Sequence, residues 1–340
     1  MMNKKKPLPL LLLAVLALAL AACGSSDDDG SSSSKATTSS GAYPVSLTGA
    51  FGTTTIDHAP SRVVTLGWSD QDVVLALGVK PVGVFDIGPD FPQGVGPWGA
   101  EQIGDAKPEK LSIADGIPFE KIAALRPDLV IAVQSGVTED DFAKLSKIAP
   151  TVTYNKGAGL YTTPWDEQAK IIGQALGQPE KAQRLVDATN KALDKAKADH
   201  PDIQGKTFSY TARQEASQVA VYTPSDLRIK FLEDLGMKLS SGQRQVAKGE
   251  QFFANVSYER LGLLDADVFV SWFNTDKDRK SFTSRPGFQD LDVIQHGGFV
   301  PLTLVEAQAQ GAPTVLSIPW AIDHVVPLIE QGLRGEGPKA

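Results

Sequence analysis

Two stretches of the sequence, FEKIAALRPDLVIA at residues 119–132 and YERLGLLDADVFVS at residues 258–271, share one pattern. Each opens with an aromatic residue, a glutamate and a basic residue, and each ends in a run of apolar residues. A helix that leads into a buried strand is the repeating unit of α/β folds. The constant offset of 139 residues therefore predicts that one α/β arrangement occurs twice in the chain.

Short strands and helices alternate on both sides of the first stretch. Before it, apolar runs at 62–66 and 81–85 predict buried strands. Ser69 and Asp72 resemble a capping box at the start of a helix that Gly78 ends. Strands that alternate with helices form parallel sheets covered by helices. The further elements expected here are a helix at 119–125 and strands at 129–133 and 151–155.

The second stretch lies among elements in a similar order. These are a strand at 219–223, a helix at 224–236 and a strand at 268–273. We therefore expect an α/β fold with two Rossmann-like lobes, at residues 43–163 and 202–340. Between them, residues 164–201 have apolar side chains at helical spacing, and Pro179 suits the first turn of a helix. One long helix is expected to join the lobes.

The N-terminus is expected to lie outside the fold. Residues 1–22 have the basic start and apolar run of a signal peptide, and the sequence LAAC that ends at Cys23 looks like the lipobox of bacterial lipoproteins. This resemblance implies a diacylglycerol anchor on Cys23, while an idle thiol or a single spanning helix is the alternative. Residues 23–42 are rich in Ser, Gly and Asp, which predicts a flexible tether after the lipidated cysteine.

Charge and cysteine content exclude several classes of function. Removal of residues 1–22 takes away three lysines and no acidic residue, so the net charge falls from −7 to −10, which argues against nucleic acid as a partner. Cys23 is the only cysteine, so neither an internal disulfide nor a cysteine metal cluster is expected. The four histidines are scattered, no serine-hydrolase motif occurs, and GVGPWG at 94–99 follows no predicted strand. We predict no metal site, no catalytic residue and no cofactor.

Tryptophans near strand ends are candidate ligand contacts, because ligands meet open parallel sheets beyond the carboxyl ends of the strands. Trp68 and Trp272 close apolar runs, so burial in the core is an equal alternative for both. Trp98 lies in a Gly/Pro-rich loop with little core to join, which favours exposure and ligand contact. Trp165 is assigned to a helix start and Trp320 to the scaffold.

The chain resembles the substrate-binding lipoproteins of iron-siderophore ABC transporters, whose fold has a single helical backbone and includes vitamin B12 and haem binders. Four stretches carry the resemblance, which covers residues 43–330: RVVTLGWSDQDVVLALGVKPVGV, IGDAKPEKLSIADGIPFEKIAALRPDLVIA, LEDLGMKL and PWAIDHVVPLI. It implies a ligand cleft between the lobes and a lipid-anchored monomer at the outer face of the cytoplasmic membrane of a bacterium. It also implies that the protein captures a ferric siderophore and delivers it to an ABC importer permease.

The resemblance also implies roles for single residues. Family members commonly place an arginine like Arg213 toward the cleft, and Arg279 is a second candidate ligand contact unless its charged loop is simply solvated. Glu120 and Glu259 match the acids that meet permease arginines, although capping of a helix dipole would explain either one. Few basic residues cluster near the proposed cleft, so a hydroxamate siderophore is favoured over a catecholate. A haem or corrinoid ligand, or an exported enzyme on this scaffold, is the alternative.

Overall fold

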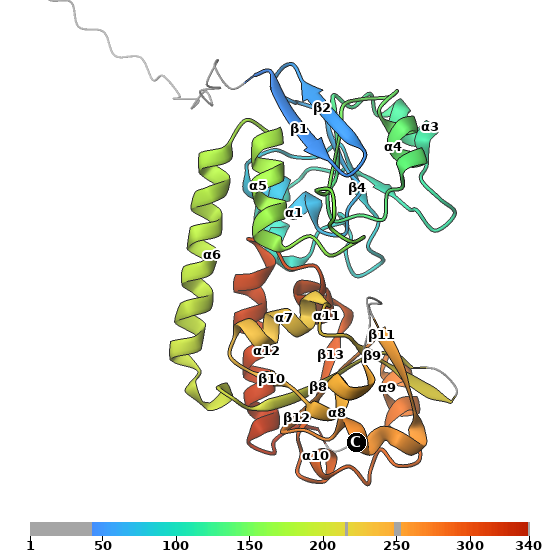
Figure 1. Cartoon of the computed structure of the whole chain (residues 1–340), viewed down its shortest axis with the longest axis vertical. Coiled ribbons are helices and arrows are strands. Elements are labelled where there is room, and N and C mark those ends of the chain that lie inside the picture. The colour runs from blue at the N-terminus through green and yellow to red at the C-terminus, as the bar shows by residue number, and fades with distance from the viewer. Residues whose placement is uncertain (1–42, 215–216, 248–252, 339–340) are drawn as a thin grey trace, which may run out of the picture. The chain divides into compact units, whose positions relative to one another are not determined.

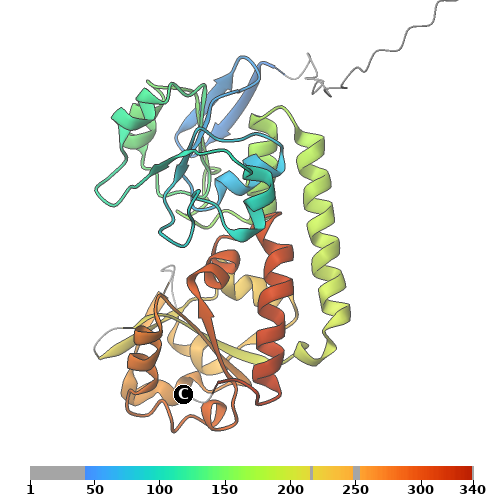
Figure 2. The ribbon, with the colours of Figure 1, turned by 180° about the vertical axis from the view of Figure 1, so that it is seen from behind.

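The structure, a computed structural model, describes residues 43–214, 217–247 and 253–338, while the side chains of residues 213 and 214 lie outside that description. The predicted signal peptide at 1–22, the predicted lipidation site Cys23 and the predicted tether at 23–42 fall outside the described residues. The described elements form two α/β lobes and a long connecting helix (Figures 1 and 2), which confirms the predicted fold class. Within this part of the chain, no helix is both long and apolar enough to cross a membrane.

The N-terminal lobe is built on a five-stranded sheet in the order β5-β4-β3-β6-β7. The sheet is parallel, as predicted, and β5 adds a strand to the four that were expected. Its central strands are buried along their whole length, which is typical of parallel sheets covered on both faces. The strands are the hairpin β1 (Val45–Gly49) and β2 (Gly52–Ile56), then β3 (Val63–Thr65), β4 (Gly83–Phe85), β5 (Glu109–Leu111), β6 (Leu129–Ala132) and β7 (Thr151–Thr153). The helices are α1 (Asp70–Ala76), η1 (Pro97–Gly99), α2 (Ala100–Ile103), α3 (Phe119–Ala124) and α4 (Glu139–Leu145).

The C-terminal lobe has a six-stranded sheet that is mixed rather than parallel. Strands β8, β10, β12 and β13 pair in parallel, whereas β9 and β11 pair antiparallel at one side, so the two lobes are similar but not equal. The strands are β8 (Thr207–Gln214), β9 (Gln218–Tyr222), β10 (Lys238–Leu239), β11 (Phe253–Ser257), β12 (Val268–Phe273) and β13 (Phe299–Thr303). The helices are η2 (Pro201–Ile203), α7 (Leu227–Asp234), α8 (Ser241–Val246), η3 (Tyr258–Leu264), α9 (Asp276–Thr283), α10 (Asp292–Gln295), α11 (Leu304–Gly311) and α12 (Ser317–Leu333).

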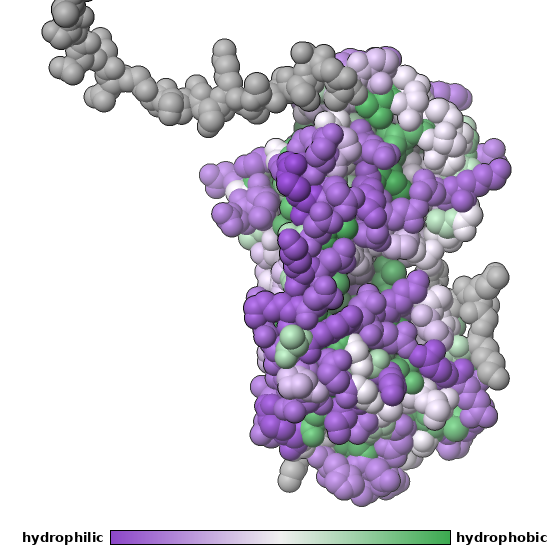
Figure 3. Space-filling model, turned by 60° about the vertical axis from the view of Figure 1, so that its left-hand side comes forward, coloured by the Kyte–Doolittle hydropathy of each residue, from purple (hydrophilic) through white to green (hydrophobic). Residues whose placement is uncertain are grey.

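The connecting segment consists of α5 (Trp165–Ala175) and α6 (Pro179–Asp199). Trp165 begins α5, as predicted, and Gly177 separates the two helices with a φ of +63°. The buried side of α6 is shared between the lobes, because Ala182 and Val186 pack into the core of the first lobe and Leu193 and Ala196 into that of the second. In Figure 3, the view that brings the α6 side forward, hydrophilic side chains predominate.

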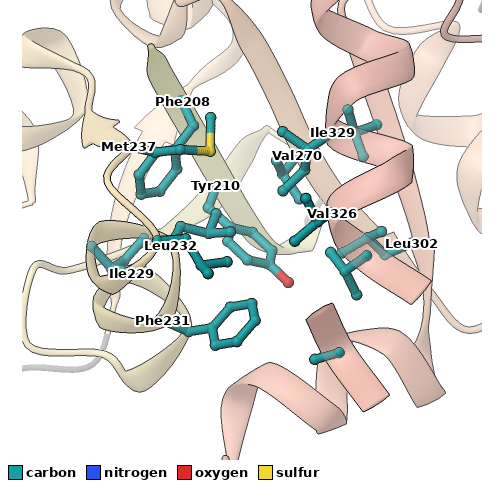
Figure 4. Packing of buried hydrophobic residues seen from close by; sticks show 14 of the residues in the cluster. Phe208, Tyr210, Ile229, Phe231, Leu232, Met237, Val270, Leu302, Val326 and Ile329 are labelled. Atoms are coloured by element: carbon teal, nitrogen blue, oxygen red, sulfur yellow. The ribbon is translucent and has the colours of Figure 1, made fainter. Parts of the chain in front are cut away.

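The core of the second lobe gathers around Tyr210, which is fully buried (Figure 4). Its ring meets the ring of Tyr222 edge-on, with the ring centroids 5.3 Å apart. Among the described residues, its hydroxyl has no hydrogen-bond partner. Burial raises the pKa of this phenol well above its ordinary value, so it stays protonated at neutral pH.

One matching position of the two repeated stretches has the same structural role in both lobes. It is occupied by Asp128 in the first stretch and by Asp267, 139 residues later, in the second. Asp128 accepts hydrogen bonds from the backbone N–H groups of Ser61 and Arg62 at 2.8 Å each, just before β3 begins. Asp267 accepts bonds from the backbone N–H and the hydroxyl of Thr207 at 2.7 and 2.6 Å, where β8 begins. Partial burial alone would raise the pKa of both carboxyls, but these bonds hold each pKa below its ordinary value. Each repeat thus fixes the start of a central strand.

A buried carboxylate connects the two lobes. Asp72 of α1 accepts hydrogen bonds from Trp98 Nε1 at 2.6 Å and from Thr314 Oγ1 at 3.1 Å, and Thr314 lies shortly before α12. Its Oδ1 is buried and, among the described residues, has no partner. The capping box predicted for Ser69 and Asp72 is wrong. The side chain of Ser69 makes no cap bond, and that of Asp72 accepts the bonds from Trp98 and Thr314 that join the lobes. The side chain of Asp72 serves tertiary structure instead.

Replacement of Asp72 by Asn is expected to change how stability depends on pH. Burial raises the pKa of Asp72 to about 7, against the opposing effect of the bonds from Trp98 and Thr314. Between about pH 4 and pH 7 the folded state therefore binds more protons than the unfolded state at this carboxyl, so its contribution to stability falls as pH rises. Asp72→Asn should remove roughly 2 to 4 kcal/mol of that fall.

Thermal or urea unfolding from pH 4 to pH 8 checks this expectation. The variant should gain stability relative to the parent as pH rises, and most of the gain should be complete at pH 8. Asp323→Asn, at an exposed position of α12, is the matched control and should follow the parent. Parallel curves for the parent and Asp72→Asn would contradict the assigned pKa.

Candidate ligand-binding site

Two adjoining pockets lie at the end of β12 and share Phe273 and Asn274. The first has a volume of about 520 Å³ and the second of about 460 Å³. The second pocket includes Asp90 of the N-terminal lobe, so it lies between the lobes, where the ligand cleft was predicted. The residues that line the first pocket are Ala212, Ala220, Tyr222, Phe253, Trp272, Phe273, Asn274, Asp278, Ser281, Phe282 and Arg285. Those that line the second are Asp90, Phe273, Asn274, Thr275, Asp276, Arg279, Pro301, Leu302, Thr303, Leu304 and Val305.

Trp272 and Tyr222 form one wall of the first pocket. Trp272 is half-buried on β12, and its Nε1 donates a hydrogen bond of 2.9 Å to the Tyr222 hydroxyl. Burial raises the pKa of Tyr222, so the phenol keeps its proton at neutral pH and its O–H can still donate. The wall therefore offers an indole face and a hydroxyl donor to a ligand.

An ion pair behind the wall holds the Tyr222 ring in place. The guanidinium of Arg228 lies 4.5 Å from the centroid of that ring, and its Nη1 is 3.2 Å from Asp226 Oδ2. Asp226 also caps α7, because its side chain accepts a hydrogen bond from the backbone N–H of Arg228. A cation over an aromatic face is attractive, and more so where water is excluded. The pair thus positions Tyr222 without itself lining the pocket.

The N-terminal lobe presents an aromatic group at the carboxyl ends of its strands. Trp68 follows β3 and is 36% exposed, so it lies at the surface rather than in the core. Its ring lies 5.2 Å from that of Phe85 and 6.4 Å from that of Tyr161. Across the lobes, Gln308 Nε2 donates a 3.4 Å hydrogen bond to the carbonyl of Trp68. Its exposure suits ligand contact, which stays a prediction.

Trp98 is more buried than its sequence predicts. The expectation that its loop has little core to join is wrong, because its ring packs against the core of the second lobe and lies 5.3 Å from the ring of Trp320. Its Nε1 is committed to Asp72, as described above. Trp320 joins the scaffold, as predicted. These contacts give Trp98 a structural role at the junction of the lobes, and its ligand role stays a prediction.

Of the two candidate arginines, only Arg279 has a side chain that the structure describes. Arg213 is the penultimate residue of β8, rather than part of a connection between strands, and its side chain lies outside the description. Arg279 of α9 lines the second pocket and pairs with Asp276, with 3.0 Å between Nη2 and Oδ1. The segment expected to be a charged loop is therefore a helix, and Arg279 on it lines the pocket. Ligand contact by either arginine remains a prediction.

Glu120 and Glu259 are both exposed. Glu120 lies in the first turn of α3, whereas Glu259 lies in η3, a 3₁₀ helix in place of the α-helix that the repeat predicts. Within the described part of the chain, neither carboxylate has a hydrogen-bond or ion-pair partner, and neither helix receives a side-chain cap bond. Both are free to meet a partner protein, which agrees with docking without testing it.

The described residues contain no group of three or more His, Cys, Asp or Glu side chains placed to hold a metal ion. GVGPWG forms a loop and the short helix η1 instead of a strand-to-helix turn, so it is not a phosphate-binding loop. Nothing in this part of the chain points to an inorganic centre built by the protein.

Several site residues escaped the sequence analysis. Tyr222 ends β9 and lies one residue before the end of the strand expected at 219–223, so the strand-end criterion used for the tryptophans would have found it. Phe253 and Arg285 carry no such signal, because they come from the edge strand β11 and from the turn after α9. Asp226 follows a proline-serine pair before a helical run, which is a recognisable cap, but its pairing with Arg228 beneath Tyr222 depends on the fold.

Comparisons with known proteins agree with this geometry. Residues 63–303 match the model of a family described as periplasmic binding protein. A probable siderophore-binding lipoprotein of Bacillus subtilis is 29% identical over 260 residues, which cover 73% of this chain and 77% of the relative. A periplasmic solute-binding protein of Mycobacterium smegmatis has a similar structure, with a TM-score of 0.76, 32% identity and coverage of 85% of this chain and 98% of that one. PiaA of Streptococcus pneumoniae, solved in complex with ferrichrome, gives a TM-score of 0.73 at 30% identity, covering 86% and 99%.

The family match spans well over half of the chain, and these relatives are binding proteins rather than enzymes. The two solved structures share the fold of this chain over more than four fifths of its length. The chain therefore belongs to the periplasmic binding protein family.

Proposed function

We propose that the protein captures a ferric siderophore and delivers it to the permease of an ABC importer. The observation that carries this proposal is the pair of adjoining pockets at the carboxyl end of β12, with aromatic walls and Asp90 of the other lobe at the rim. The relatives named for siderophores and ferrichrome support the same class of ligand. A concave site with apolar walls and a few placed polar groups suits a metal chelate of this size.

A trihydroxamate chelate fits the charges of the pockets best. Their described lining carries three carboxylates, Asp90, Asp276 and Asp278, and two guanidinium groups, Arg279 and Arg285. A strongly anionic catecholate would need a clear excess of cations, which this lining lacks. A neutral ferric trihydroxamate instead needs apolar surface and donors to its oxygens. The Trp272 indole and the Tyr222 hydroxyl supply both.

Delivery rests on exposed acids and on a lipid tether. Glu120 and Glu259 are the proposed contacts with permease arginines, one from each lobe. Cys23 is the proposed anchor that holds the protein at the outer face of the cytoplasmic membrane, which would raise its concentration near the permease. Mass spectrometry of the processed protein should find a diacylated Cys23 at its N-terminus, and an unmodified mature cysteine would contradict the anchor.

Trp272→Ala should weaken the binding of ferrichrome by roughly 30-fold or more, as is typical when a central aromatic contact is truncated. It removes the indole face and the donor to Tyr222. Trp272→Phe keeps an aromatic face, and its loss should be smaller. Isothermal titration calorimetry avoids the optical change that any tryptophan variant causes.

Trp165→Phe, at the start of α5 and outside both pockets, is the matched control and should bind like the parent. Titration with ferric enterobactin, haem and cobalamin tests the other ligand classes. Unchanged ferrichrome affinity in Trp272→Ala would remove the site from this wall. Tighter binding of haem or cobalamin than of any ferric siderophore would refute the proposed function.

Replacement of Glu120 and Glu259 together by Gln should abolish siderophore-dependent iron uptake in cells and leave ferrichrome affinity intact. Loss of one partner of a buried interfacial charge pair can cost about 2 to 5 kcal/mol, so the loss of docking should be large. If the acids only stabilise their helices, the double variant should instead lose about 0.3 to 1 kcal/mol of stability per site. Normal uptake together with a lowered melting temperature would support that second role and contradict docking.

A further inference from the structure

Helix α9 lies between the ligand pocket and one of the proposed docking residues. Phe282 of α9 and Arg285, two residues past its end, both line the first pocket. The same two side chains contact Tyr258. The guanidinium of Arg285 lies 5.3 Å from the centroid of the Tyr258 ring, and the ring of Phe282 lies 6.4 Å from it at 50°. The same two side chains therefore border both the pocket and Tyr258.

Tyr258 directly precedes Glu259 and opens η3. Its backbone follows the last paired residue of β11, so its position is fixed on one side by the sheet and on the other by the contacts of its ring. Glu259 is exposed on the same short helix. The Tyr258 ring is thus one residue away from the carboxylate that is proposed to meet the permease.

Polar groups of α9 and of the turn after it line the pockets. Arg285, in that turn, lines the first pocket, and chelate oxygens accept hydrogen bonds from guanidinium groups. The N–H groups of Arg285 lie in the plane of its guanidinium and its face covers Tyr258, so a bond to a chelate oxygen would set the orientation of that plane and with it the contact with Tyr258. The second pocket adds Asp276 and Arg279 of the same helix, so a ligand that fills both pockets contacts α9 along its length.

The first lobe repeats the aromatic arrangement without the connection to the pocket. Lys144 Nζ lies 5.3 Å from the centroid of the Phe119 ring, which precedes Glu120 as Tyr258 precedes Glu259. Lys144 belongs to α4, and no residue of α4 lines either pocket. The two docking residues are therefore built alike, but only Glu259 stands next to an aromatic ring whose neighbours, Phe282 and Arg285, also line the ligand pocket.

We infer that α9 and Tyr258 couple occupation of the pocket to the position of Glu259, so that the permease distinguishes the loaded protein from the empty one through the second lobe. This inference rests on the proposed function, since it takes Glu259 as a docking residue and a ferric siderophore as the ligand. Tyr258 is a positioning residue in this account. It lines neither pocket and acts through its neighbour.

The test compares the affinity of the permease, held in lipid nanodiscs, for the full-length protein saturated with ferrichrome and for the iron-free protein. The parent should bind more tightly when loaded, by about 10-fold, within the usual range of coupling between two sites. Tyr258→Leu removes the face on which Arg285 stacks and should bring this ratio to within about 2-fold. Tyr258→Phe keeps the ring and should keep the parent's ratio. The matched variant in the first lobe, Phe119→Leu, should also keep it.

Each other outcome counts against the inference. A parent's ratio retained by Tyr258→Leu would overturn the coupling, and so would an equal loss of the ratio in Phe119→Leu, since the effect would then be structural. Equal binding of the loaded and empty parent would overturn the coupling while docking itself stands. If the parent bound neither ferrichrome nor the permease, the proposed function would fail, and the inference would fall with it.

Discussion

Helix α6 offers one apolar stripe to two separate hydrophobic cores. Ala182 and Val186 lie in the core of the first lobe, and Leu193 and Ala196, two to four turns further along, lie in that of the second. A helix holds its length and direction, so neither lobe can turn far about it without exposing apolar surface. The joint at Asp72, Trp98 and Thr314 adds a second link. Together they keep the facing sheet ends, and hence the pockets, in a narrow range of positions.

The two stretches that repeat at an offset of 139 residues each contain a residue that stabilises the fold and an exposed residue that a partner protein could contact. In both lobes the aspartate near the end of the repeat binds the backbone where a central strand begins. In both, the glutamate near its start is left exposed beside an aromatic ring that a cation covers. The lobes differ in where that cation comes from. Only in the second lobe does it also line the pocket, so the two lobes would be unequal partners in the proposed delivery.

The elements with strong local signals were predicted from the sequence. Continuous apolar runs identified β3, β6 and β12, and helical spacing with Pro179 identified α6. The predictions failed where a side chain serves tertiary structure. Asp72 has the spacing of a capping residue but bonds across the lobes, and Trp98 lies in a loop yet packs on the second core. The walls of the site were only partly predicted, because Phe253 and Arg285 reach the pocket from an edge strand and a turn that no motif marks.

The proposed function requires that the two pockets hold a ferric siderophore. The most direct measurement is the visible spectrum and intact native mass of the protein purified from iron-limited cells without added ligand. We predict a charge-transfer band of a ferric hydroxamate and a mass that exceeds the apoprotein by one chelate. A haem Soret band or a corrinoid spectrum, with the corresponding mass, would contradict the claim.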